Sequence, residues 1–143
     1  MAFGPIMTIQ GLPYVSLRPI DHEDIGEFVR DGAMQSGRVK QFLDSQFAQV
    51  FRDEEEWYEK VRTDHTQLVW GIYAEENLIG TTGFEGIGDQ HFHPYFKGAI
   101  SGGMIFRPDH WDLGIMGTCH KARTWYGLTQ AIGLQRIISG VYA

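Results

Sequence analysis

The stretch from Met104 to Thr118 reads MIFRPDHWDLGIMGT and carries the information that decides the fold. Its first residues are apolar, as at the end of a buried strand, and Pro108 to Leu113 reads as a short connection. Gly114 then opens a helix. A helix start presents backbone N–H groups without partners and a partial positive charge, and glycine lets an anion approach that backbone closely. The segment therefore predicts a cradle for a diphosphate group, formed by Leu113 to Thr118.

One other interpretation of this segment stays open at this point. The spacing Gly114-x-x-Gly117 also fits a helix that simply packs closely on its neighbours. The common nucleotide signatures do not decide the matter, because the sequence has no Walker lysine pattern and no G-x-G-x-x-G after its first strand.

Working outward, the apolar periodicity predicts strands and helices along the whole chain. A helix around Ile25 to Val29, a helical stretch from Val39 to Val50 and a third helix capped by Asp53 are expected before the central hairpin. The helix from Gly114 is expected to run to about Ile132, with Gly133 in a left-handed conformation after it. The predicted strands are Tyr14 to Arg18, Leu68 to Ala74, Leu78 to Glu85, Ala99 to Phe106 and Arg136 to Tyr142. This order predicts an α/β (α+β) domain with a mixed sheet, whose last two strands run parallel through a right-handed crossover.

Composition narrows the class of protein. The 143 residues correspond to one domain, and the formal net charge of −6 argues against a nucleic-acid-binding surface while permitting a cationic or amine substrate. The single cysteine, Cys119, permits no internal disulfide. No signal peptide and no membrane-length apolar run is present, so we predict a cytoplasmic protein without a membrane partner.

The span from Trp111 to Met116 resembles the acetyl-CoA-binding motif of the GNAT superfamily of N-acetyltransferases, whose pattern is (Arg/Gln)-x-x-Gly-x-(Gly/Ala). Gly114 fits the central glycine of that pattern. Trp111 and Met116 depart from it, and both resemble the form found in the ribosomal-protein N-terminal (RimJ/RimL-like) acetyltransferase branch.

Three further segments resemble the same branch, in the same order along the chain. They are its opening strand, its central hairpin and the entry to its fifth strand, here Leu17-Arg18-Pro19-Ile20, Trp70 to Gly83 and Gly133 to Ile137. The resemblance implies a GNAT-like mixed central sheet flanked by helices. In the family a further helix and two strands follow the fifth strand, so residues 1–143 are expected to form a single acetyltransferase-like domain that is incomplete at its C-terminus. An uncovered last strand is also expected to favour a homodimer.

The resemblance implies acetyl-CoA as co-substrate and transfer of its acetyl group to a primary amine, on a protein N-terminus or a small molecule. It places the cofactor arm along Met104, Ile105 and Phe106, and its diphosphate at Leu113, Gly114, Ile115, Met116, Gly117 and Thr118. Two alternatives remain: a catalytically inactive acyl-CoA-binding or interaction module, and a relative in fold alone that binds another phosphorylated ligand.

Catalytic side chains are harder to predict. Glu85 is the candidate general base, because the resemblance places that strand end on the substrate side; a solvated strand-end carboxylate is the alternative. His110 and His120 fit surface or packing roles, and Cys119 fits a small buried helix residue. His91 and His93 lack a third ligand, so no metal site is expected. The run Glu54 to Glu56 fits a solvated helix start, or an attraction for a cationic substrate.

Overall fold

The computed structural model describes residues 3–30, 39, 50–89, 97–130 and 132–139, and within them the chain forms one six-stranded sheet in the order β1-β2-β3-β4-β5-β6. The strands are β1 (Met7–Thr8), β2 (Val15–Arg18), β3 (Leu68–Ala74), β4 (Asn77–Glu85), β5 (Gly98–Ile105) and β6 (Arg136–Ser139). Neighbours from β1 to β5 are antiparallel, whereas β5 and β6 are parallel. The mixed sheet and the parallel last pair are therefore confirmed.

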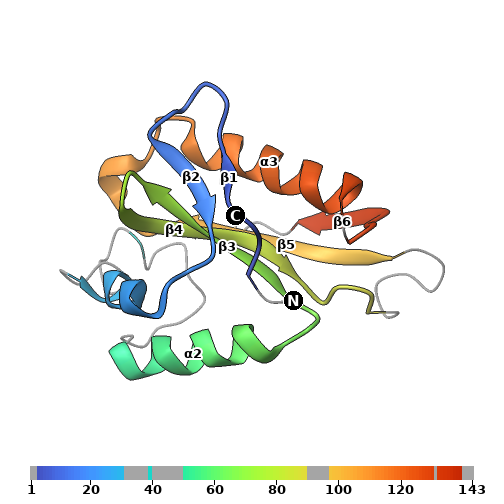
Figure 1. Cartoon of the computed structure of the whole chain (residues 1–143), viewed down its shortest axis with the longest axis horizontal. Helices are drawn as coiled ribbons and strands as arrows, with labels where there is room; N and C mark the ends of the chain where they lie inside the picture. Colours follow the sequence, from blue (N-terminus) through green and yellow to red (C-terminus); the bar gives the residue numbers. More distant parts are fainter. Residues whose placement is uncertain (1–2, 31–38, 40–49, 90–96, 131, 140–143) are drawn as a thin grey trace.

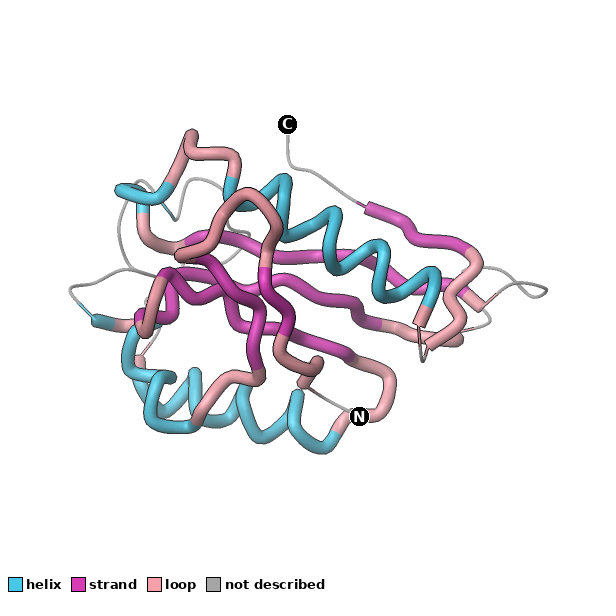
Figure 2. Tube along the Cα trace, turned by 45° about the horizontal axis from the view of Figure 1, so that its top comes forward, coloured by secondary structure: helices cyan, strands magenta, loops and turns pink. Residues whose placement is uncertain are grey.

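Helices cover the two faces of the sheet. Helix α3 (Ile115–Thr129) lies along one face, and α2 (Phe51–Thr63) lies on the other with the 3-10 helix η1 (His22–Phe28) (Figures 1 and 2). A second short 3-10 helix, η3 (Pro108–His110), leads into α3. All seven residues of β3 are buried, and they alternate between two cores: Trp70 and Ile72 face α3, whereas Val69 and Tyr73 face α2 and η1. The sheet thus separates two apolar layers.

Two helix predictions before the central hairpin need correction. The helix around Ile25 is the 3-10 helix η1, consistent with the low helix propensity of Gly26 within it. Asp53 does not occupy the cap position of α2: the helix begins at Phe51 after Val50, and the Asp53 carboxylate accepts the Val50 N–H at 2.9 Å from the third helical position. The predicted stretch from Val39 to Val50 lies almost wholly outside the described residues.

The end of α3 also differs from the prediction. The helix ends at Thr129, three residues earlier than expected, because the chain turns back and the Leu134 N–H donates to the Gly127 carbonyl at 2.9 Å. Gly133 has the expected left-handed conformation, with φ +63°, but it lies in this turn. A returning backbone therefore satisfies a carbonyl of the last helical turn.

The last described strand, β6, lies at one edge of the sheet. Its predicted continuation to Tyr142 falls outside the described residues, and pairing of this edge with a second copy stays a prediction. In the part of the chain that is described, no helix is long and apolar enough to cross a membrane.

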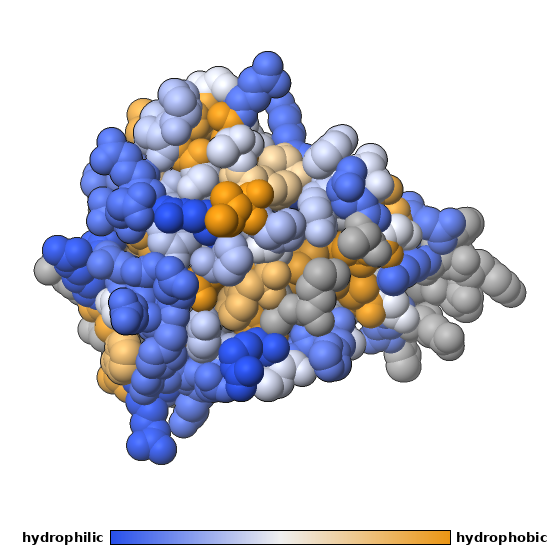
Figure 3. Space-filling model, in the orientation of Figure 1, coloured by the Kyte–Doolittle hydropathy of each residue, from blue (hydrophilic) through white to orange (hydrophobic). Residues whose placement is uncertain are grey.

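Helix α2 presents two contrasting faces. Its outer face carries Arg52, Glu55, Glu56 and Glu59 around a shallow depression, in a region that the space-filling view shows as mostly hydrophilic (Figure 3). Glu54 lies on the inner face, only 7% exposed, one turn before Trp57. Burial, with a smaller contribution from Asp53, raises the pKa of Glu54 to about 6. The expectation of a solvated helix start is therefore wrong for Glu54.

The raised pKa of Glu54 predicts a pH-dependent stability. Its pKa is about 6 in the folded chain against 4.5 ordinarily, so the native state holds a proton that the unfolded state releases. The free energy of unfolding therefore falls as the pH rises through this window, by about 2 kcal/mol from this group. We expect Glu54→Gln to raise stability at pH 7.5 relative to the unsubstituted protein and to change it little at pH 4, as measured by urea unfolding. Equal effects at the two pH values would contradict this assignment.

Candidate functional site

The start of α3 is open to solvent. Gly114 precedes the helix in a left-handed conformation, with φ +76°, which explains why glycine stands there. Its carbonyl accepts the first helical bond from the Thr118 N–H and a second bond from the Thr118 hydroxyl at 2.8 Å. A Cβ added at Gly114 or Gly117 would meet no atom within 4 Å, and Leu113 is exposed. The first turn of α3 is therefore exposed at Leu113, Gly114 and Gly117, and the unpaired N–H groups of such a helix start can bind an anion.

One tryptophan ties this helix start to the sheet. The Trp111 indole donates to the Ile105 carbonyl at 2.8 Å, and its ring packs against both cores. Asp112 follows with a left-handed φ of +60° and turns the chain toward Gly114. The connection between β5 and α3 is thus held in one conformation at both of its ends.

The three residues predicted to lie along the cofactor arm differ in how far their side chains are exposed. Ile105 points its side chain into the core on the α3 side, and Phe106 points its side chain into the core on the α2 side. The centroid of the Phe106 ring lies 4.9 Å from that of Phe28. Only Met104 is partly exposed. Along the described residues, pairing of β5 with β6 ends at Ser101 and Ser139, so β5 continues beyond that point paired with β4 alone. A ligand along this edge would meet β5 backbone and Met104.

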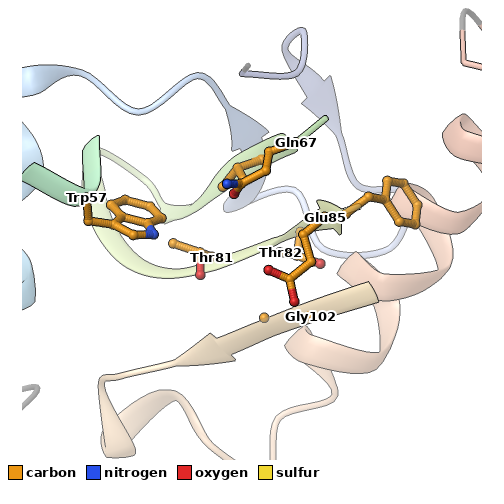
Figure 4. A pocket seen from close by; sticks show the side chains of 10 residues that line it. Trp57, Gln67, Thr81, Thr82, Glu85 and Gly102 are labelled. Carbon is orange, nitrogen blue, oxygen red and sulfur yellow. The ribbon is translucent and has the colours of Figure 1, made fainter. Parts of the chain in front are cut away.

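A cleft of about 160 Å³ opens beside the same part of β5. Trp57 enters it from α2, Thr81 from β4 and Gln67 from the loop before β3 (Figure 4). Glu85, at the exposed end of β4, points its carboxylate toward Gly102 on β5 (Figure 4). The residues that line the cleft are Trp57, Gln67, Val69, Thr81, Thr82, Gly83, Phe84, Glu85, Gly102 and Gly103.

The cleft therefore contains the candidate base but also residues that sequence reasoning did not select. Trp57 is one of these residues, and its position at the cleft depends on how α2 lies on the sheet. The pair Gly102–Gly103 within a predicted strand was a usable signal, since glycine inside a strand often marks close approach by another group.

Polar side chains also lie beneath this cleft. The Thr82 hydroxyl lies 2.9 Å from Nδ1 of the partly buried His120 and 3.1 Å from Nη1 of the buried Arg123, both on α3. Because arginine can only donate, the Thr82 oxygen accepts from Arg123. The direction of the hydrogen bond between Thr82 and His120 depends on which ring nitrogen carries the proton. Burial, with the nearby Arg123 charge, lowers the pKa of His120 to about 4.

The remaining candidates fit structural roles. Cys119 is fully buried, and burial raises the pKa of its thiol to about 12, which leaves it without nucleophilic thiolate at neutral pH. His110 lies 3.8 Å from the Asp109 carboxylate in the connection before α3. The described segments hold no group of three or more potential metal ligands. His91 and His93 fall outside those segments, so the expectation about them stays a prediction.

The described residues thus combine a mixed α/β sheet, an exposed glycine-containing helix start after β5 and a cleft beside the same strand. The chain belongs to the GNAT acetyltransferase domain family, whose model matches residues 15–143. The resemblance to this family is thereby confirmed. No protein of curated function gave a significant match.

Solved structures support the fold. Spermidine N-acetyltransferase from Vibrio cholerae, in complex with CoA and spermine, superposes with a TM-score of 0.71 at 21% identity, covering 90% of this chain and 71% of that one. Mycobacterium smegmatis RimJ, in complex with CoA-disulfide, gives 0.71 at 16% identity, with 96% and 66% covered. A Bacillus halodurans protein gives 0.72 at 9% identity, with 98% and 72% covered.

The partial burial of His120 beside the Arg123 charge predicts that its imidazole stays neutral in the folded protein over the range in which a free histidine titrates. We expect its Cε1–H NMR signal to stay constant from pH 8 to about 5.5, because folding lowers its pKa well below the ordinary value of about 6.5. The same histidine in urea-unfolded protein serves as the control and should titrate normally. A native signal that moves with a midpoint near 6.5 would show that the ring is solvated.

Proposed function

We propose that this protein is an acetyl-CoA-dependent N-acetyltransferase that transfers an acetyl group to a primary amine. The observation that carries the proposal is the open first turn of α3, placed by Trp111 directly after the strand that borders the cleft. The chain's family is one of acetyltransferases, and similar folds occur in a spermidine N-acetyltransferase and in RimJ, both bound to forms of CoA. A protein N-terminus and a small polyamine-like molecule are the two acceptor classes that we consider.

The open helix start fits the anionic part of the co-substrate. We assign the diphosphate to the segment from Leu113 to Thr118, where the N–H groups that precede the first helical bond, which is made by Thr118, and the helix dipole favour negative charge. The acyl-bearing arm would then run along β5 past Met104, Ile105 and Phe106, with backbone rather than the two buried side chains as its support. This direction leads from the α3 start toward Gly102, which lines the cleft.

Transfer requires a neutral amine in line with the thioester carbonyl. The amine attacks the carbonyl carbon, the C–S bond breaks, and the amine proton passes to a base while the thiolate leaves as CoA. We assign the base role to Glu85, whose carboxylate enters the cleft beside Gly102 (Figure 4). A carboxylate at the cleft would also attract a cationic acceptor before its proton is removed.

The direct test is release of free thiol from acetyl-CoA in the presence of a panel of primary amines, including spermidine and short peptides. We expect thiol release that depends on both substrates. Binding of CoA without thiol release for any amine would instead support an acyl-CoA-binding or interaction module, and stabilisation by ATP but not by CoA would support a different phosphorylated ligand.

A substitution at the start of α3 can separate the effect on CoA binding from the effect on stability. Gly117 is exposed at the third helical position, with open space where a side chain would project. Gly117→Glu should weaken CoA binding by roughly 10- to 100-fold through like-charge repulsion, as measured by calorimetry. The same carboxylate should leave the thermal midpoint unchanged or higher, since an acid near a helix start contributes about 0.3–1 kcal/mol.

Gly117→Gln is the matched control, because it has the same length and shape without the charge. Its dissociation constant for CoA should lie within about threefold of that of the unsubstituted protein, because its side chain can occupy the open space beside Gly117. Equal CoA affinities for the Glu and Gln variants would argue against a diphosphate at this site.

The base assignment is tested by Glu85→Gln. We expect kcat to fall by roughly 100-fold or more, because an amide cannot take up the amine proton, while the affinity for CoA stays unchanged. Glu76→Gln, in the exposed turn at the opposite end of β4, is the control and should leave kcat unchanged. A Glu85→Gln protein with full kcat would remove Glu85 from the mechanism.

A further inference from the structure

Arg123 occupies an unusual place for a charged residue. The buried residues of α3 are Ile115, Cys119, Arg123 and Gly127, a single line at intervals of four residues that faces the sheet. Arg123 is 4% exposed within this line, between a buried cysteine and a glycine. At such a position the usual occupant is an apolar side chain, because taking a guanidinium out of water is costly.

Among the described residues, the contacts of Arg123 do not include a compensating acid. Its Nη1 donates to the Thr82 hydroxyl on β4 and to the Gly102 carbonyl on β5, both at 3.1 Å, and its Cζ lies 5.3 Å from the centroid of the Phe84 ring. Its Nε is buried without a hydrogen-bond partner. Within the described residues the charge is therefore balanced by a carbonyl, a hydroxyl and an aromatic face, which is a weaker compensation than a carboxylate.

The residues that Arg123 and His120 contact lie at the cleft. Thr82, Gly102 and Gly103 all line the cleft on β4 and β5. Arg123 bonds to the first two, and the His120 ring stands so close to Gly103 that an added Cβ would lie 3.2 Å from its Cε1 and 2.5 Å from the Thr81 carbonyl. Polar side chains of α3 thus hold the floor of the cleft from below.

The position of Gly102 gives this contact its significance. Gly102 is the first β5 residue beyond the last pair that β5 forms with β6 in the described part of the sheet. A backbone carbonyl needs a hydrogen-bond partner to keep it in a fixed direction, and Arg123 donates to that of Gly102. Two successive glycines make the need greater, since their backbone has more freedom than that of other residues.

We propose that Arg123 is a positioning residue, which fixes the Gly102–Gly103 backbone and so aligns the cleft floor with the cofactor-binding start of its own helix. The assignment rests on the proposed acetyl transfer for its kinetic consequence. Arg123 touches neither co-substrate in this arrangement. Its effect on the reaction comes from holding β5, along which the acyl-bearing arm would lie, in register with the cleft that holds the amine.

The test compares Arg123→Met with Arg123→Lys. Methionine fills a similar volume without donors and removes the buried charge, so the variant should fold with a thermal midpoint close to or above that of the unsubstituted protein. Its kcat should fall by roughly 10- to 100-fold, while the dissociation constant for CoA stays within about threefold. Lysine can still donate to Thr82 and Gly102, so it should restore part of the lost kcat.

Arg136→Met, on the exposed start of β6, is the matched control and should leave kcat unchanged. A readout that does not depend on activity is the amide NMR signals of Gly102 and Gly103, which should shift in Arg123→Met and not in Arg136→Met. If the unsubstituted protein releases no thiol with any amine, the proposed function fails and these amide signals still decide whether Arg123 positions β5.

The proposal is overturned by an Arg123→Met protein that keeps its kcat within twofold, or by Gly102 and Gly103 signals that do not move. Should the methionine variant fail to fold, the lysine variant decides alone: a reduced kcat with unchanged CoA affinity and shifted glycine amides supports the assignment, and unsubstituted values for all three refute it.

Discussion

The hydrogen bond from the Trp111 indole to the Ile105 carbonyl joins the two halves of the candidate site. One partner is the last residue of β5, and the other stands three residues before Gly114, where α3 is about to begin. The bond fixes how far and in which direction the helix start stands from the strand. If a diphosphate sits on the helix and the arm attached to it runs along the strand, both must be supported from this one corner. A loop of the same length without this hydrogen bond would leave the end of β5 and the start of α3 free to move relative to each other.

Residues at the end of β5 contact the apolar cores on both faces of the sheet. Met104 packs against the core on the α2 side and Ile105 against the core on the α3 side, so successive residues of β5 belong to different layers. The cleft with Trp57 and Glu85 opens near this strand, while α3 reaches the same backbone from the opposite face through Arg123. A substrate in the cleft and a cofactor at the helix start would therefore meet along one strand that both cores hold in place.

The sequence was sufficient for the parts of the fold that depend on local pattern. The hairpin of β3 and β4, the strand β5 and the helix opened by Gly114 follow from alternation, turn residues and glycine placement, and the structure has all of them. Boundaries failed where tertiary contacts decide them, as at Thr129, where a bond between Leu134 and Gly127 closes the helix early. The burial of Glu54 was missed for a similar reason, because three successive glutamates look alike in sequence and only the packing of α2 distinguishes them. The helix start at Gly114 was predictable, because it depends on a backbone property of glycine. The position of Trp57 at the cleft and the contacts of Arg123 were not, because they arise from elements far apart in the chain.

Arg123 illustrates why the buried side of α3 is not simply apolar. An aliphatic residue at this position would avoid the cost of burying a charge and would pack against Phe84 and Cys119. It could not bond to a hydroxyl on β4 and a carbonyl on β5 at the same time, as Arg123 does. The stability given up is thus exchanged for a fixed relation between a helix and two strands. Such an exchange is expected where alignment of two ligands matters more than the stability of the layer that separates them.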